Sequence, residues 1–153
     1  MKHLLSVVAV LILLWAGPLV ANACSCAPEV GESEKERVEN ASKNATAVFL
    51  GKVVKVTKVK DSATGFPTDV IVEFKVERAW SRIKAARVTI HTAGNSAACG
   101  FEFRKGLSYI VYASGDSKLK VFSCSRTAML EDTGSADEQY LGVPTYIGPW
   151  KKK

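Results

Sequence analysis

The fold class of this chain is decided by the stretch DVIVEFKVERAW, residues 69–80. Its two faces carry Val70, Val72, Phe74 and Val76 on one side and Ile71, Glu73, Lys75 and Glu77 on the other. Successive side chains of a β-strand point to opposite faces. The alternation therefore predicts a strand that buries one face and leaves the other in solvent.

Similar β-forming runs lie on both sides of this stretch. We predict strands over residues 46–60, with a bend at Gly51, and over residues 87–92, 107–113 and 118–123. The tetrapeptide SGDS at 114–117 predicts a hairpin turn between the last two. Polar residues 31–45 indicate a surface helix, and residues 132–141 a second short one. Five strands with one or two flanking helices predict a mainly β, closed or partly open barrel.

The composition is that of one globular domain, with 47% hydrophobic and 24% charged residues. The net charge of +6 includes three lysines at the very end of the chain, residues 151–153. The rest is close to balanced, which excludes a strongly basic nucleic-acid-binding domain. Residues 127–153 carry no functional motif, and we treat them as a C-terminal extension of unknown role.

Residues 1–23 have the layout of a secretory signal peptide. Lys2 and His3 precede an apolar run over residues 4–16, and the cleavage signal ANA at 21–23 precedes Cys24. The run is shorter than the roughly 20 residues of a membrane-spanning helix. We therefore expect a secreted protein, or a periplasmic one in a bacterium. Lipidation of Cys24 is the alternative, but Ala21 and Asn22 fit ordinary cleavage better.

All the cysteines follow the leader, at Cys24, Cys26, Cys99 and Cys124. An even number in a small exported domain indicates two disulfides. One of the three pairings would close a tiny ring between Cys24 and Cys26, whereas the other two tie the N-terminus to distant parts of the chain. A metal site is disfavoured because the chain has no second C-x-C and no C-x-x-C.

The sequence CSCAP at 24–28 resembles the mature N-terminus of the tissue inhibitors of metalloproteinases, which belong to the netrin-like superfamily. Further likenesses follow in order: AVFLGKV at 47–53, CG at 99–100, SYIVYA at 108–113, and residues 119–124, which end in Cys124. The resemblance covers residues 24–126. It implies a five-stranded, OB-fold-like Greek-key barrel with the disulfides Cys24–Cys99 and Cys26–Cys124.

The resemblance also implies a function, the inhibition of zinc metalloendopeptidases. The residues it places against the protease are Cys24, Ser25, Cys26, Ala27, Pro28, Ser96, Ala97 and Ala98. The α-amine and carbonyl oxygen of Cys24 would chelate the protease zinc, which keeps one coordination position open. Ser25 would face the S1′ pocket. Cleavage before Cys24 is essential, because an internal residue offers an amide in place of the amine.

The alternative is a secreted netrin-like OB-fold module that binds proteins or glycans without inhibiting a protease. A surface of aromatic residues and lysines could serve it, but core packing and solvated lysines explain these residues better. They are Trp80, Tyr109, Tyr112, Phe122, Lys52, Lys55 and Lys120. An enzyme is not expected, because His91 is the single histidine after the leader and no catalytic motif accompanies it. We expect a monomer without cofactor, nucleic acid or membrane span. Asn40 and Asn44 each begin a glycosylation sequon.

The exported protein should have the intact mass of residues 24–153 with two disulfides, because the signal at 21–23 directs cleavage immediately before Cys24. Mass spectrometry before and after reduction tests this. A mass raised by a diacylglyceryl group would contradict it and would rule out chelation by a free amine.

Overall fold

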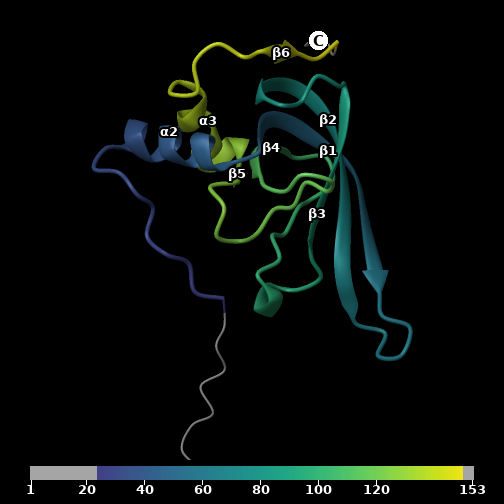
Figure 1. Cartoon of the computed structure of the whole chain (residues 1–153). Helices are drawn as coiled ribbons and strands as arrows, with labels where there is room; N and C mark the ends of the chain where they lie inside the picture. The colour runs from purple at the N-terminus through teal and green to yellow at the C-terminus, as the bar shows by residue number, and fades with distance from the viewer. Residues whose placement is uncertain (1–23, 150–153) are drawn as a thin grey trace, which may run out of the picture.

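The computed structural model of this protein describes residues 24–149, so the predicted signal peptide and the terminal lysines lie outside the described residues. The strands of the described part are β1 (Ala47–Lys60), β2 (Pro67–Ser81), β3 (Arg87–Ala93), β4 (Ser108–Ala113), β5 (Ala128–Met129) and β6 (Tyr146–Ile147). They form one antiparallel sheet, with helix α2 (Glu34–Asn44) and the short α3 (Ser135–Glu138) together on one side of it (Figure 1). The predicted mainly β fold is confirmed.

The strand order is β3-β2-β1-β4-β5, with β6 paired to β2. Three consecutive strands are followed by a fourth that returns beside the first, which is the expected Greek-key order. β1 and β2 form a long hairpin, and its turn is held by Asp61, whose Oδ1 accepts hydrogen bonds from the backbone N–H of Ala63 and Thr64 at 3.0 and 2.8 Å. The bonds from Thr64 and Ala63 hold the pKa of Asp61 below its ordinary value.

The sheet is not closed into a barrel, so of the two predicted forms, closed or partly open, the closed one is not found. The segment at 118–123, predicted as a strand, makes isolated bridges, from Lys120 to His91 of β3 and to Ser114 beyond β4. The segment therefore bridges β3 and the end of β4, which lie apart in the strand order, but it forms no continuous ladder with either. The chain turns away at Phe122, whose carbonyl accepts from the N–H of Ser125 at 2.9 Å, and leads into Cys124. This turn ends the pairing that a fifth barrel strand would need.

The core follows the alternation that the sequence shows in β2. Val72, Phe74 and Val76 are fully buried, and Val70 nearly so. The Phe74 ring packs edge-on against three other aromatic rings, those of Phe49, Phe103 and Tyr109, at centroid distances of 5.4, 5.3 and 6.5 Å. This aromatic cluster lies on the face of the sheet away from α2.

A second, smaller core lies under helix α2. Val48, Leu50, Ile110 and Tyr112 are buried there, with Ala41 and Ala45 of the helix packed against them. The helix begins at a capping box, in which the Ser33 side chain accepts from the backbone of Glu36 and the Glu36 side chain accepts from Ser33 N–H. The predicted helix at 31–45 is confirmed. The second helix is shorter than residues 132–141, because a π-helical turn (η2, Leu130–Gly134) precedes α3.

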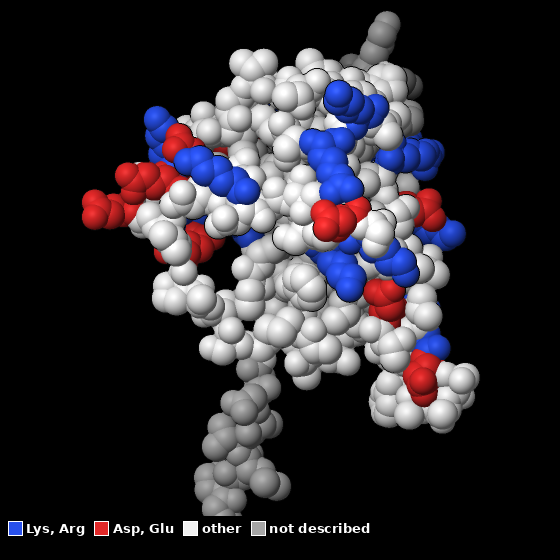
Figure 2. Space-filling model, in the orientation of Figure 1, with Lys and Arg blue, Asp and Glu red and all other residues white. Residues whose placement is uncertain are grey.

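Residues 127–149 are packed onto the domain rather than hanging from it. β5 pairs with β4, and β6 pairs with Arg78 and Ala79 of β2. On the face shown in Figure 2, lysines and arginines gather over the strands with a few acidic residues among them, and the helical side also carries both signs. Among residues 24–149 no helix has the length and apolar character needed to cross a membrane.

Phe74→Ala should lower the free energy of unfolding by about 3–5 kcal/mol, because it opens a cavity among the aromatic rings. Chemical denaturation of the purified protein measures the loss. Phe66→Ala is the matched control, since that ring is 72% exposed and its removal should cost at most about 0.5 kcal/mol. Equal losses in the two variants would contradict the assigned core.

Candidate functional site

Two disulfides fix the start of the described chain. Cys24 is bonded to Cys99 and Cys26 to Cys124, with Cα–Cα distances of 5.3 and 5.1 Å. The two bridges lie against each other, because the sulfurs of Cys24 and Cys124 are 3.8 Å apart. This is the pairing that the family resemblance implies, so that prediction is confirmed.

The predicted contact residues form one exposed surface, which we call the N-terminal edge and define as residues 24–28 and 96–98. Residues 25–28 are exposed, and Cys24 is partly so. Ser96, Ala97 and Ala98 form an exposed 3-10 turn (η1), and the bond from Cys24 to Cys99 holds the first residue beside it (Figure 1). The structure therefore places Cys24 beside the turn at 96–98, and residues 25–28 continue from it as an exposed segment.

The loop that carries η1 is tightly built. The side chain of Asn95 accepts from Ala98 N–H at 2.9 Å, and the backbone carbonyl of Asn95 accepts from Gly100 N–H at 2.9 Å. Cys99 adopts a left-handed conformation with φ of 61°. Only glycine fits at position 100, because a Cβ there would lie 2.2 Å from the carbonyl oxygen of Ala93. The second half of the N-terminal edge is therefore a rigid support.

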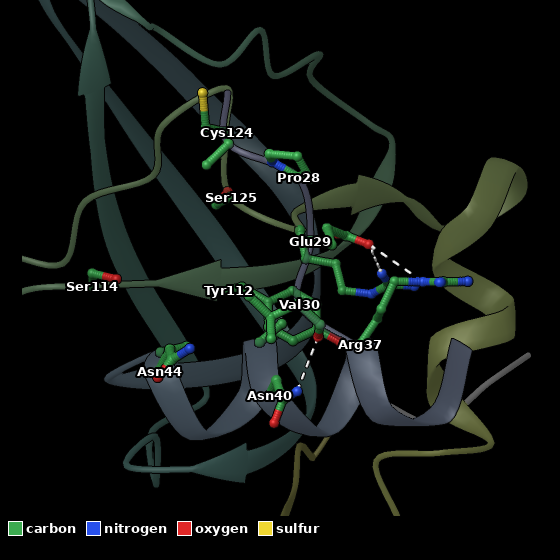
Figure 3. Close-up of a pocket in the computed structure, with 14 residues that line it drawn as sticks. Pro28, Glu29, Val30, Arg37, Asn40, Asn44, Tyr112, Ser114, Cys124 and Ser125 are labelled. Atoms are coloured by element: carbon green, nitrogen blue, oxygen red, sulfur yellow. Dashed lines mark hydrogen bonds and ion pairs between the residues drawn. The ribbon is translucent and has the colours of Figure 1, made fainter. Parts of the chain in front are cut away.

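A cavity of about 260 Å³ lies behind the N-terminal segment, between residues 27–30 and helix α2 (Figure 3). The side-chain amide of Asn40 donates to the carbonyl oxygen of Val30 across it at 2.9 Å. This bond ties the segment to the helix. It also uses the side chain of one of the two sequon asparagines, whereas Asn44 is exposed.

The side chain of Arg126 is the centre of a half-hidden charge network and is only 10% exposed. Its guanidinium pairs with Asp137 at 2.9 Å, with Glu29 at 2.5 Å and with Glu34 of α2. The hydroxyl of Tyr112 on β4 donates to the same Asp137 carboxylate at 2.8 Å. The network therefore joins the N-terminal segment, α2, β4 and α3.

The network fixes the charge states of its members. Burial lowers the pKa of Arg126, but hydrogen bonds to Asp137 and Glu34 outweigh it and hold the pKa above its ordinary value. Burial, together with the charge of Asp137, raises the pKa of the Tyr112 phenol. Hydrogen bonds from Arg37 and Arg126 lower the pKa of Glu34. Arg126 is therefore a permanent cation that organises three carboxylates.

Sequence reasoning did not find this network. Its members come from five separate segments, and each one taken alone is an ordinary surface charge or a strand residue. They are Glu29, Glu34, Tyr112, Arg126 and Asp137. Core packing likewise explains part of the aromatic surface considered above. Tyr109 is buried in the first core and Tyr112 in the second, and each is only 3% exposed. Phe122 differs, because it is 44% exposed.

The reactive chemistry of the described part is sparse. Among residues 24–149 no group of three His, Cys, Asp or Glu side chains is placed to hold a metal ion. All four cysteines are in disulfides. The group that the N-terminal edge can offer to a partner is the α-amine of Cys24, which cleavage before that residue would create.

Comparison with known proteins adds no assignment. No protein-family model matches this chain, and no curated protein matches it.

Acid should destabilise the protein through Glu34. The folded-state pKa of Glu34 lies below the ordinary 4.5. The contribution of Glu34 to the free energy of unfolding is therefore complete above about pH 4.5, and it is lost as the pH falls through the folded-state pKa. In Glu34→Gln the fall in the free energy of unfolding below pH 4.5 should be shallower. The effect is modest because this side chain is 43% exposed.

Denaturant titrations across this pH range measure the slope. Glu32→Gln is the matched control, because Glu32 lies outside the Arg126 network and its loss should leave the slope as in the wild type. If the free energy of unfolding of Glu34→Gln falls with pH as steeply as that of the wild type, Glu34 does not contribute to the loss of stability in acid.

Proposed function

We propose that the mature protein inhibits zinc metalloendopeptidases, with the α-amine and carbonyl oxygen of Cys24 as ligands of the protease zinc. The observation that carries the proposal is the double anchoring of the N-terminus, Cys24 to Cys99 and Cys26 to Cys124, while residues 25–28 remain exposed. Simple stapling of a chain end does not require that the residues between and after the two anchors face solvent.

The chemistry suits a catalytic zinc. Such a metal keeps one coordination position open for water or substrate. An α-amine has a pKa of about 8, so zinc has to displace its proton only modestly at neutral pH. The carbonyl oxygen of the same residue supplies a second ligand atom. Together they would displace the water that the protease needs for hydrolysis.

Rigidity supports tight binding. The segment from Cys24 to Val30 is held by the two disulfides, by the pair of Glu29 with Arg126 at 2.5 Å, and by the bond from Asn40 to the Val30 carbonyl at 2.9 Å. A segment that is already fixed loses little conformational entropy when it enters an active-site cleft. Little of the free energy gained from contacts with the protease would then be offset by the cost of ordering the segment, and the affinity would be correspondingly higher.

The side chains of the N-terminal edge are small. Ser25 would enter the S1′ pocket, Ala27 and Pro28 would follow the cleft, and residues 96–98 would form a second ridge. Small side chains allow the backbone to approach closely. Because they bury little apolar area, zinc chelation and backbone contacts would supply most of the affinity.

Export belongs to the same proposal. Two disulfides are compatible with an oxidising compartment outside the cytoplasm. The proposed inhibitor is therefore a secreted protein that meets its protease there. The netrin-like binding module is the other outcome, in which the same staples hold a domain that binds without inhibiting.

Adding one alanine before Cys24 should abolish inhibition, because it converts the amine into an amide nitrogen that cannot ligate zinc. Ser25→Gly is the companion variant. It keeps the amine and should weaken inhibition rather than abolish it. The measurement is titration of the mature protein and both variants against a panel of zinc endopeptidases.

Both variants should retain two disulfides and the thermal stability of the wild type, which confirms that the fold is intact. If no protease in the panel is inhibited, or if the alanine-extended form inhibits as well as the mature protein, chelation by Cys24 is refuted. The binding module then becomes the better account.

A further inference from the structure

A second cavity, of about 310 Å³, lies where the start of β2, the end of β3 and the segment at 118–122 meet. It includes none of the residues of the N-terminal edge. The side chains that give it its character are Asp69, His91, Lys118, Lys120 and Phe122. Its size is at the lower end of the range for small-molecule sites.

Backbone pairing explains why these residues meet. His91 and Lys120 form a parallel bridge, with His91 N–H donating to the Leu119 carbonyl and Val121 N–H donating to the His91 carbonyl, each at 2.9 Å. Val121 is fully buried, so its extended neighbours face outward. Lys118, Lys120 and Phe122 are all exposed and follow the same period of two.

Some polar groups of the cavity already form a hydrogen bond with each other, and others have no partner within the described residues. The Nδ1 of His91 lies 2.8 Å from Oδ2 of Asp69 and donates to it, because a carboxylate only accepts. This leaves Nε2 of His91 and Oδ1 of Asp69 for another partner. The cations are less constrained, since within residues 24–149 neither Lys118 nor Lys120 forms an ion pair. The cavity therefore combines spare positive charge with two unused polar atoms, Asp69 Oδ1 and His91 Nε2.

We propose that this cavity binds an acidic saccharide, with one sugar unit inside it. A carboxylate or sulfate group would pair with Lys118 and Lys120. A ring hydroxyl would donate to Asp69 Oδ1, and the apolar face of the sugar ring would pack on Phe122, which is 44% exposed.

The same chemistry disfavours an acidic peptide. An acidic side chain offers no donor to Asp69 Oδ1, whereas a sugar ring carries hydroxyl donors close to its anionic group. An exposed aromatic ring between lysines is also of little use to a purely charged ligand. The aromatic ring and the acceptor together therefore select a saccharide over other anions.

The saccharide site is independent of the proposed inhibition. It lies near the N-terminal edge, since Phe122 bridges to Gly100 and precedes Cys124 by two residues, but it uses neither Cys24 nor its amine. Binding can therefore be measured without a protease, and either proposal can fail while the other holds.

The experiment is isothermal titration calorimetry of the mature chain, residues 24–153, with three probes. They are a sulfated uronic-acid tetrasaccharide, a neutral glucose tetrasaccharide and a tetraglutamate peptide. The first should bind saturably, and the other two should bind at least about tenfold more weakly. Lys118→Gln, Lys120→Gln and Phe122→Ala should each weaken the first probe by about tenfold, because each removes one of its main contacts.

Two matched controls keep the result specific. Lys84→Gln removes an exposed lysine outside the cavity, and Phe66→Ala removes an exposed phenylalanine at the tip of the β1–β2 hairpin. Both should bind like the wild type, and all variants should unfold at the temperature of the wild type. The proposal is overturned by absence of saturable binding, by equal binding of tetraglutamate, or by controls that lose as much affinity as the cavity variants.

Discussion

The structure depends on two disulfides that lie side by side and bind the first and third residues after the predicted cleavage point. They close loops with sequence separations of 75 and 98 residues. In the chain-entropy account, a disulfide that closes a loop of this size lowers the conformational entropy of the unfolded chain. It thereby raises the free energy of unfolding by roughly 4–5 kcal/mol. The same bonds fix where Cys24 and Ser25 lie. Stability and the presentation of the N-terminus therefore have one cause.

The Arg126 network extends this constraint beyond the cysteines. The Arg126 guanidinium pairs with Glu29 of the N-terminal segment and also with Glu34 of α2 and Asp137 of α3. The N-terminal segment is therefore tied to both helices. Arg126 and Asp137 are the buried pair of the network, so removing Asp137 would leave the guanidinium poorly compensated, which is costly. Because Asp137 belongs to residues 127–149, the C-terminal extension takes part in positioning the N-terminus.

Much of the fold could be predicted from the sequence, where the signal was long and periodic. The alternation of β2 and the polar run at 31–45, which became α2, both predicted the correct element. The segment at 118–123 misled because its β-forming residues make isolated bridges before the chain turns into Cys124. β5 and β6 were missed because each has two residues, too few to show any period.

The fold was predicted from residue patterns, whereas the candidate site was predicted from a family resemblance. Cys24 and its neighbours came from a family resemblance, and the disulfides were found as that resemblance implies. The Arg126 network could not be predicted, because its residues come together only through tertiary contacts. Lys120 and Phe122 were considered for glycan binding, but the cavity they form with Asp69 and His91 depends on tertiary pairing. Arg126 and Lys120 look in the sequence like ordinary solvated charges.

The central claim is that Cys24 and Cys26 are anchored separately and in this pairing. Mass spectrometry of the non-reduced mature protein, with backbone fragmentation between Cys24 and Cys26, tests it most directly. We predict that the fragment with Cys24 carries the Cys99 peptide and that the fragment with Cys26 carries the Cys124 peptide. Exchanged partners, a Cys99–Cys124 link or free thiols would contradict the account.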